Sequence, residues 1–413
     1  MTVTADLVDA AAARIADRVA STPLHRSERL STFTGAEIWL KREDLQAVRS
    51  YKVRGAYNLI SSLDDAARAA GVVTASAGNH AQGVAFTCEA LDVRGRVYLP
   101  HSTPRQKCRR IAELGGARIE LILTGATYDE AALAAREDAE RTGATMVPAF
   151  DDVRTVAGQG TVAREIVAQL GREPDVLVVP VGGGGLLAGS IAWLGNRARI
   201  VGVEPMGAAC VAAALEAGEP VDLPHLDTFV DGAAVTRAGT VPFAIIQNSG
   251  AELIDVPTGA VCSEMLELYQ VDGIIAEPAG ALACAALTGR LVSGITPGTT
   301  VVCVLSGGNN DISRYAEIIE RAMLHEGRKL YFLVEFHQEP GALRRFLDEV
   351  LGPDDDIVLF EYIKRNNRET GPALVGIELA RPEDAPALLA RMRTTPINVE
   401  QVDPAGPLFQ FLI

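Results

Sequence analysis

Lys52 is the residue of this sequence with the clearest potential for covalent chemistry. It follows Ser50 and Tyr51 and directly precedes Val53 to Leu63, whose pattern predicts a helix. A lysine at a helix start opposes the helix dipole, which makes the position unfavourable. The preceding stretch from Leu40 mixes apolar and charged residues, which favours a lysine held in a defined pocket. Without further context, an exposed surface lysine is the commoner case.

The segment Ser76-Ala77-Gly78-Asn79-His80 lies between a predicted strand, Val72 to Ser76, and a predicted helix, Asn79 to Leu91. One interpretation is a simple turn in which Ser76 or Asn79 caps the helix. The other is an anion site, because small residues let backbone N–H groups approach a carboxylate at the positive end of a helix. The segment alone leaves both open.

Four successive glycines, Gly182 to Gly185, separate a predicted strand, Asp175 to Val181, from a predicted helix, Leu186 to Leu194. Four glycines cost conformational entropy on folding, which disfavours a purely structural role. Backbone N–H groups in such a turn, together with the helix dipole, can cradle a phosphate. The loop lacks the Lys-Ser/Thr of a P-loop and the GxGxxG spacing, so nucleoside triphosphates and dinucleotides are disfavoured as ligands.

A fourth polar segment, Ser306-Gly307-Gly308-Asn309-Asn310, follows the apolar strand predicted for Thr300 to Leu305. In open α/β sheets, ligands bind outside the carboxyl ends of the strands. A lysine for a Schiff base, a phosphate loop and a polar group for a ring nitrogen are together what pyridoxal phosphate requires.

Composition and charge narrow the class of protein. The 413 residues carry a formal net charge of -15, which argues against nucleic acids and anionic membranes as partners. The amino terminus lacks the pattern of a secretory signal, and the uncharged run from Val176 to Asn196 contains Pro180 and the glycines, so a membrane span is disfavoured. No cysteine spacing suggests zinc, and six scattered cysteines predict reduced thiols and a cytoplasmic location. They are Cys88, Cys108, Cys210, Cys262, Cys284 and Cys303.

Strands and helices are predicted to alternate from Val72 to Leu305, which indicates βαβ units, a parallel sheet and an α/β fold class. Further predicted helices are Asp6 to Val19, Pro104 to Gly116, Tyr128 to Arg141, Val153 to Leu170, Gly259 to Gln270, Pro278 to Leu287 and Asp311 to His325. Further predicted strands are Arg96 to Pro100, Arg118 to Leu123 and Arg199 to Glu204.

The pattern changes near Glu326-Gly327, where the order becomes βαββαβ, typical of a ferredoxin-like α+β module of about 85 residues. Its predicted strands are Lys329 to Phe336, Asp356 to Arg365, Ala373 to Leu379 and Pro407 to Phe411, and its predicted helices are Pro340 to Leu351 and Pro382 to Arg393.

The combined motifs resemble the threonine dehydratase branch of the fold-type II pyridoxal-phosphate enzymes, whose architecture is tryptophan-synthase-β-like. The resemblance covers nearly the whole chain and rests on the following stretches: Lys41 to Ala56, Ala75 to Gly83, Phe150-Asp151-Asp152, Gly158 to Thr161, Gly182 to Leu186, Glu277 to Gly280 and Ser306 to Asn309. In the tail, Pro340 to Leu343 and Arg365-Asn366-Asn367 are similar to the ACT-like regulatory domain of the biosynthetic enzymes.

The resemblance implies a role for each matching residue. Lys52 is the catalytic residue and binds pyridoxal 5′-phosphate covalently, Asn79 bonds the 3′-oxygen of the ring, and Ser306 meets the ring nitrogen. The phosphate is held by Gly182, Gly183, Gly184, Gly185 and the Leu186 amide. The substrate carboxylate lies near Ser76, Gly78, Asn79 and His80.

The resemblance also implies the function and the domains. Residues 1–325 form the catalytic region, with a smaller α/β domain at about 45–150 inserted in the larger one, and residues 326–413 form the ACT-like domain. The expected reaction is dehydration and deamination of L-threonine, and also of L-serine, to a 2-oxo acid and ammonia, in the first committed step of isoleucine biosynthesis. Isoleucine is the expected feedback inhibitor, with valine as a second candidate effector, and the chain is expected to form a homodimer or homotetramer.

Two departures from related families bear on the alternatives. Racemases of this fold carry a second serine as acid and base where this chain has Ala77, which cannot transfer a proton, so dehydration is favoured over a serine or threonine racemase. Some relatives bind a divalent cation where this chain has Glu204, Ala208 and Cys210, so no metal site is predicted. A cofactor-free amino-acid sensor is disfavoured because Lys52, the glycines and Ser306 are all present.

Overall fold

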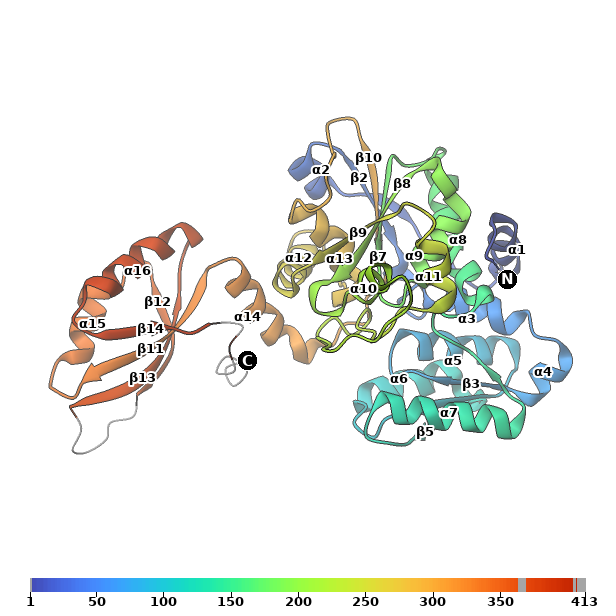
Figure 1. The fold of residues 1–413 in the computed structure, drawn as a ribbon, viewed down its shortest axis with the longest axis horizontal. Helices are drawn as coiled ribbons and strands as arrows, with labels where there is room; N and C mark the ends of the chain where they lie inside the picture. The colour runs from blue at the N-terminus through green and yellow to red at the C-terminus, as the bar shows by residue number, and fades with distance from the viewer. Residues whose placement is uncertain (1, 363–368, 404–405, 407–413) are drawn as a thin grey trace. The chain divides into compact units, whose positions relative to one another are not determined.

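The computed structural model describes residues 2–362, 369–403 and 406 (Figure 1). These residues divide into two compact units between Asp311 and Ile312. This division precedes the boundary expected near Glu326-Gly327, because helix α14 (Tyr315–His325) groups with the second unit. Within the described part of the chain, no helix is both long and apolar enough to cross a membrane.

The larger sheet of the first unit has six strands in the order β1-β2-β10-β7-β8-β9. All neighbours pair in parallel except β1, which joins one edge in the antiparallel direction. The strands are β1 (Leu24–Arg26), β2 (Glu37–Arg42), β7 (Val176–Pro180), β8 (Arg199–Pro205), β9 (Glu252–Val256) and β10 (Thr300–Leu305). Strands β7 and β10 are buried along their whole length, as expected for parallel strands covered on both faces.

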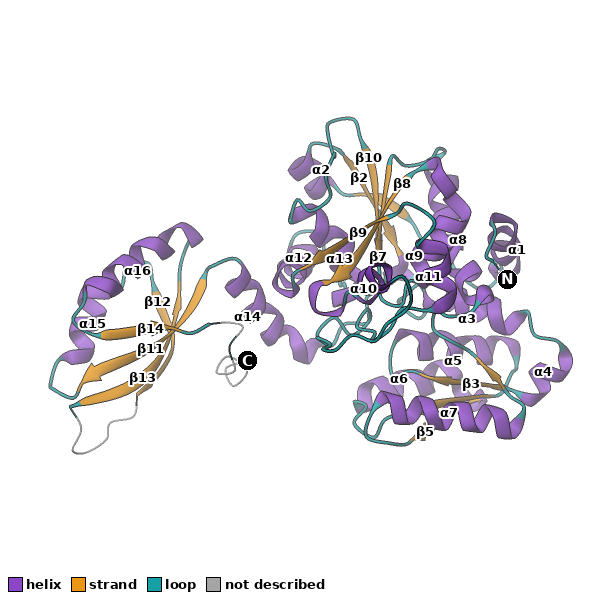
Figure 2. Cartoon of the chain, viewed as in Figure 1, coloured by secondary structure: helices purple, strands orange, loops and turns teal. Residues whose placement is uncertain are grey.

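Helices cover both faces of this sheet (Figure 2). On one side lie α2 (Glu28–Thr34), α12 (Thr258–Gln270) and α13 (Pro278–Thr288), and on the other lie α8 (Val153–Leu170), α9 (Gly185–Leu194) and α11 (Thr240–Ile246). Helix α1 (Ala5–Ile15) packs on α8 and α9, and α10 (Cys210–Ala217) contacts α11.

The smaller sheet has four parallel strands in the order β5-β4-β3-β6. It contains β3 (Val72–Ala75), β4 (Gly95–Leu99), β5 (Ile119–Leu123) and β6 (Thr145–Met146), and its part of the chain carries α3 (Lys52–Ser61), α4 (Asp65–Ala70), α5 (Asn79–Leu91), α6 (Arg105–Gly115) and α7 (Tyr128–Thr142). All four strands lie in the chain between β2 and β7 of the larger sheet. Two parallel sheets in one unit confirm the predicted fold class.

The second unit is an antiparallel α+β domain with the strand order β12-β13-β11-β14. After α14 come β11 (Lys329–His337), α15 (Ala342–Val350), β12 (Asp356–Tyr362), β13 (Thr370–Glu378), α16 (Ala385–Thr394) and β14 (Asn398–Gln401). This is the predicted βαββαβ order. Its core is apolar, with Phe332, Phe336 and Phe346 almost completely buried.

Some predictions for the tail fall outside the described residues. They are the strand at Pro407 to Phe411, the end of the strand at Asp356 to Arg365, and the Arg365-Asn366-Asn367 motif. Strand β14 (Asn398–Gln401), which was not predicted from the sequence, pairs with β11 in the antiparallel direction.

Candidate active site

Lys52 is the first residue of helix α3, and no side chain caps the start of that helix. Its Nζ donates a hydrogen bond to the carbonyl oxygen of Ala149 at 3.1 Å. The same nitrogen lies 5.1 Å from the ring centre of Tyr51 and 5.9 Å from that of Phe150. The lysine is therefore partly buried and its amine lies near two aromatic rings.

The backbone before Lys52 is tied to the loop after strand β10. The Tyr51 amide donates to the Ser306 carbonyl at 3.1 Å, and the Gly308 amide donates to the Arg49 carbonyl at 2.9 Å. Arg49 has a φ of 55°, a conformation that L-residues rarely adopt. The paired loops fix Lys52 relative to Ser306, although the two lie far apart in the sequence.

A buried network of charges anchors the lysine-bearing segment. Arg54, two residues after Lys52, is completely buried and pairs with Glu43 at 2.8 Å and with Glu165 on α8 at 2.7 Å. The Nζ of Lys41 also reaches Glu165, at 2.8 Å. Burial opposes ionisation of Glu43, but the Arg54 guanidinium holds the pKa of this carboxyl below its usual value. The network therefore fixes the start of α3 against strand β2 and helix α8.

The glycine loop connects β7 to α9, with Gly184 as the N-cap at a φ of 90°. A side chain is excluded at Gly183, where a Cβ would lie 2.4 Å from the Phe150 ring, and at Gly185, where it would lie 2.4 Å from the Gln159 side chain. No side chain caps α9, and the first N–H groups of a helix have no partner within it. The loop is therefore backbone without side chains at the carboxyl end of a central strand, and it leads into N–H groups that have no partner within α9.

Asn79 begins helix α5, and its side chain is held on two sides. Its Nδ2 donates to Glu277 Oε1 at 2.5 Å, and its Oδ1 accepts from Asn309 Nδ2 at 2.7 Å. Ser306 is buried, and its hydroxyl donates to the Ala279 carbonyl at 3.2 Å. The structure therefore links the 76–80 turn, the 306–310 loop and the start of α13.

Comparison with known proteins identifies the family. A family model described as pyridoxal-phosphate dependent enzyme matches residues 15–307, more than half of the chain. This chain belongs to the pyridoxal-phosphate dependent enzyme family. A second model, the C-terminal regulatory domain of threonine dehydratase, matches residues 320–412 of this family member. Both matches agree with the resemblance on which the sequence analysis relied.

Similar proteins include curated relatives along nearly the whole chain. The L-threonine dehydratase biosynthetic IlvA of Mycobacterium tuberculosis (strain ATCC 25618 / H37Rv) is 61% identical over 411 residues, which cover 98% of this chain and 95% of that protein. The protein of the same name from Bacillus subtilis (strain 168) is 47% identical over 402 residues, covering 97% of this chain and 95% of that protein.

Solved structures resemble this pyridoxal-phosphate dependent enzyme in fold. The processed threonine deaminase isoform 2 of Solanum lycopersicum superposes with a TM-score of 0.72 and 35% identity, over 78% of this chain and 95% of that one. A serine racemase from maize gives a TM-score of 0.72 and 29% identity, over 79% of this chain and 99% of that one. The fold is thus shared by dehydratases and racemases.

The geometry of the site fits pyridoxal phosphate. The glycine loop offers backbone donors without side chains, which suits a phosphate. Phe150 forms a wall between this loop and the Lys52 amine. The Ser50 hydroxyl beside the lysine is buried and has no hydrogen-bond partner among the described residues. A phosphate-bearing aldehyde that binds covalently to the Lys52 amine would find hydrogen-bond donors in the glycine loop and in the Ser50 hydroxyl.

His80 presents its backbone rather than its ring to this region. Its Nε2 lies 2.7 Å from the Val147 carbonyl, which can only accept, so Nε2 carries the hydrogen and Nδ1 is a bare acceptor. Burial, followed by the charge of Lys52, lowers the pKa of His80 to about 4, so the ring is neutral near pH 7. A neutral ring in this tautomer has no N–H for a carboxylate. The backbone N–H at the second position of α5 can still donate.

The remaining predicted contacts of the 76–80 turn lie nearby. Ser76 Oγ accepts from the Gly78 amide at 3.3 Å, which orders the turn. A Cβ on Gly78 would meet no atom within 4 Å, so the turn faces open space there. Ala77 packs against an apolar cluster and offers no exchangeable proton.

The Glu204 carboxyl holds the start of helix α10 through hydrogen bonds to its backbone. Both carboxyl oxygens of Glu204 accept backbone hydrogen bonds, from Val211 at 2.8 Å and Ala212 at 2.9 Å, at the start of α10. Burial nevertheless raises the pKa of Glu204 to about 7. In the described part of the chain, no group of three or more His, Cys, Asp or Glu could hold a metal ion.

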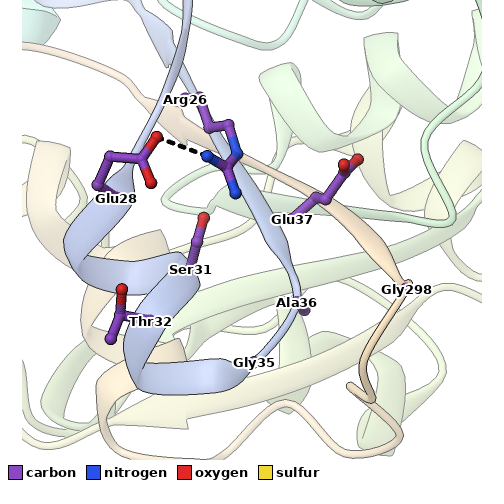
Figure 3. Close-up of a pocket in the computed structure, with 8 residues that line it drawn as sticks. All are labelled: Arg26, Glu28, Ser31, Thr32, Gly35, Ala36, Glu37 and Gly298. Carbon is purple, nitrogen blue, oxygen red and sulfur yellow. Dashed lines mark hydrogen bonds and ion pairs between the residues drawn. The ribbon is translucent and has the colours of Figure 1, made fainter.

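A pocket elsewhere in the first unit carries no comparable chemistry (Figure 3). It lies around β1, α2 and the start of β2. Of the three charged residues that line it, Arg26 pairs with Glu28 at 2.5 Å, and the third is Glu37.

Several residues that line the site carry no signal in the sequence for their role. Phe150 and Glu277 belong to recognised motifs, but only the fold places them beside the glycine loop and Asn79. The Ala149 carbonyl carries no sequence signal, because any residue could supply it. The signal for Asn309 was its place beside Ser306 in a polar loop.

Proposed function

We propose that this chain catalyses the dehydration and deamination of L-threonine to 2-oxobutanoate and ammonia, the committed step of isoleucine biosynthesis. The main support is the convergence of Lys52, the glycine loop and Ser306 in a chain whose relatives at 61% identity are named biosynthetic threonine dehydratases. The match to a threonine dehydratase regulatory domain supports the biosynthetic form of the enzyme.

The cofactor would be held by the residues that the sequence predicted. Gly182, Gly183, Gly184, Gly185 and the Leu186 amide hold the phosphate, because their donors precede α9. Asn79 binds the 3′-oxygen of the ring. Ser306 turns its single proton from the Ala279 carbonyl toward the ring nitrogen, since a hydroxyl rotates to suit its partner.

Lys52 would bind the cofactor covalently and then act as the base. When bound, the cofactor supplies an electron sink for the substrate α-carbon. With substrate bound, the free Lys52 amine would remove the substrate α-proton, a transfer worth about 10²–10⁴ in rate. Because Ser306 is neutral, it gives little support to charge on the ring nitrogen, which favours immediate loss of the β-hydroxyl. The β-hydroxyl would leave with a proton as water, and the released enamine would take up one water to give the 2-oxo acid and ammonia.

The substrate carboxylate would bind at the start of α5. The backbone N–H groups of Asn79 and His80 occupy the first two positions of this helix, where the dipole favours an anion. Ser76 and Gly78 border the same turn. Racemisation is disfavoured, because Ala77 cannot return a proton from the opposite face.

We further propose that isoleucine binds the C-terminal unit and inhibits the reaction, with valine as a second effector. The support is the regulatory-domain match at residues 320–412. Coupling between such sites typically amounts to about 1–3 kcal/mol. A single regulatory module can pair only with that of another chain, which favours a dimer or tetramer. The six free cysteines suit a reducing, cytoplasmic setting.

Turnover assays with L-threonine and L-serine, with and without isoleucine, test this function. We expect 2-oxobutanoate from threonine and a higher half-saturation concentration when isoleucine is present. Formation of D-threonine or D-serine without 2-oxo acid would favour a racemase. A rate curve that isoleucine leaves unchanged would reject the proposed effector.

A further inference from the structure

The side-chain amide of Asn79 has only one orientation that satisfies its neighbours. Asn309 Nδ2 donates both to the Val48 carbonyl at 2.8 Å and to Asn79 Oδ1 at 2.7 Å. Because the carbonyl only accepts, Asn309 must present its nitrogen there, and Asn79 must present its oxygen to Asn309. Asn79 Nδ2 therefore faces Glu277, to which it donates at 2.5 Å. The reversed amide would place oxygen against the Glu277 carboxyl.

The position of the Glu277 side chain is determined by its contact with Asn79 and not by helix capping. It is the N-cap of α13, yet its side chain does not cap that helix. The carboxyl instead reaches Asn79, which is 198 residues away in the sequence. Its backbone amide donates to the Gly307 carbonyl at 3.1 Å, and a Cβ on Gly307 would lie 2.2 Å from Glu277 Oε1. The glycine beside Ser306 is thus required for the Glu277 side chain to lie where it does.

A buried carboxyl is costly, and no side chain described here neutralises this one through an ion pair. Glu277 is 5% exposed. Burial, followed by the Asp231 carboxylate, raises its pKa to about 7, against the hydrogen bond from Asn79 and the charges of Lys107 and Lys52. Uncompensated buried carboxyls destabilise a fold, so stability does not account for this residue.

We propose that Glu277 is a positioning residue for the cofactor, which fixes the Asn79 amide so that its second N–H faces the site. This inference rests on the proposed contact between Asn79 and the 3′-oxygen of the ring. Glu277 uses one of the two hydrogens on Asn79 Nδ2, and Asn309 occupies the oxygen. The second hydrogen on Asn79 Nδ2 is then free to be donated to the cofactor.

Three substitutions separate the reach of the Glu277 side chain from its charge. Glu277→Met keeps the length and removes the acceptor, Glu277→Asp keeps the charge but falls short of Asn79, and Glu277→Gln keeps the reach and an acceptor oxygen without the charge. The measured quantity is the dissociation constant of pyridoxal phosphate, from titration of the apoenzyme followed by the absorbance of the bound cofactor. Circular dichroism reports whether each variant is folded.

We expect Glu277→Met and Glu277→Asp to weaken cofactor binding about tenfold, because the hydrogen bond from Asn79 Nδ2 is lost and only Asn309 then holds the Asn79 amide. Glu277→Gln should stay within about threefold of the unmodified chain. In an Asn79→Ala background, Glu277→Met should add less than about twofold, because the residue acts through that amide. Glu264→Met, which removes another buried carboxyl, on α12, should leave the affinity within about twofold.

The outcomes separate this inference from the proposed site. If Asn79→Ala weakens binding but Glu277→Met and Glu277→Asp do not, Glu277 is not a positioning residue, and the Asn79 contact stands. Equal losses from Glu277→Met with and without Asn79→Ala would also overturn the inference. If Glu277→Gln falls as far as Glu277→Met while Glu277→Asp is unaffected, charge rather than reach matters, and the inference is wrong. If Asn79→Ala itself has no effect, the proposed cofactor contact fails together with it.

Discussion

Replacing Gly183 by alanine should weaken cofactor binding, because the added Cβ would clash with Phe150 and distort the glycine loop. A Cβ there would lie 2.4 Å from one carbon of the Phe150 ring and 2.5 Å from two others. Carbon atoms in contact normally lie about 3.5–4.0 Å apart, so the ring or the loop must move by about 1 Å. Overpacking of this kind costs about 1–3 kcal/mol.

The groups that would be displaced are the glycine loop, which is proposed to hold the phosphate, and the Phe150 ring, whose centre lies 5.9 Å from Lys52 Nζ. If this cost is paid when the cofactor binds, the affinity for pyridoxal phosphate should drop by a factor between about 5 and 160. The assay is titration of the apoenzyme, with urea denaturation as a check on the fold.

The matched control is a double-mutant cycle with Phe150→Ala. Removal of the ring removes the clash, so Gly183→Ala should cost much less in the Phe150→Ala background than in the unmodified chain. Unchanged cofactor affinity in Gly183→Ala, or equal losses in both backgrounds, would refute the reasoning.

Two further predictions concern stability, both measured by urea denaturation. Burial raises the pKa of Glu204 from 4.5 to about 7, so its contribution to stability is fully present below pH 4.5 and is lost as the pH rises through 7. Relative to Glu204→Gln, the unmodified chain should therefore lose about 2–3 kcal/mol of unfolding free energy between pH 5 and pH 8, and a constant difference would contradict this. Arg54→Met leaves the buried carboxyl of Glu43 without its main partner and should cost about 3–5 kcal/mol. Arg109→Met, whose guanidinium side chain is 83% exposed in its pair with Glu113, should cost less than about 1 kcal/mol, and equal losses would show that burial is not decisive.

Local signals predicted many of the elements well. The helix predicted for Val153 to Leu170 has those bounds in the structure, because Asp152 caps its start and Gly171 takes the left-handed conformation after its end. Strand β10, predicted as Thr300 to Leu305, also has those bounds, since a continuous apolar run is a strong signal for a buried parallel strand.

Elements stabilised by distant partners were harder to predict. Strand β2, at Glu37–Arg42, was not predicted because Lys41 and Arg42 give it a polar pattern. Lys41 is completely buried, and its charge is compensated by Glu165, which lies 124 residues later in the chain. Burial lowers the pKa of Lys41, and only the fold reveals the carboxylates that oppose this effect.

In the candidate site, too, local signals were readable from the sequence and contacts between distant segments were not. Glycines and polar residues at the ends of strands were visible in the sequence, because turns impose local requirements on residue type. The contacts that orient these residues are not local, since Asn79 meets Asn309 and Glu277 only through the packing of distant segments. The direction of the His80 ring likewise depends on the Val147 carbonyl.

The central claim is that Lys52 is the residue that binds the cofactor covalently. Borohydride reduction of the enzyme with pyridoxal phosphate, followed by peptide mass mapping, tests it most directly. We predict a single reduced cofactor adduct on the peptide that contains Lys52, and no adduct and no threonine turnover in Lys52→Ala. An adduct on another lysine, or turnover retained by Lys52→Ala, would contradict the account.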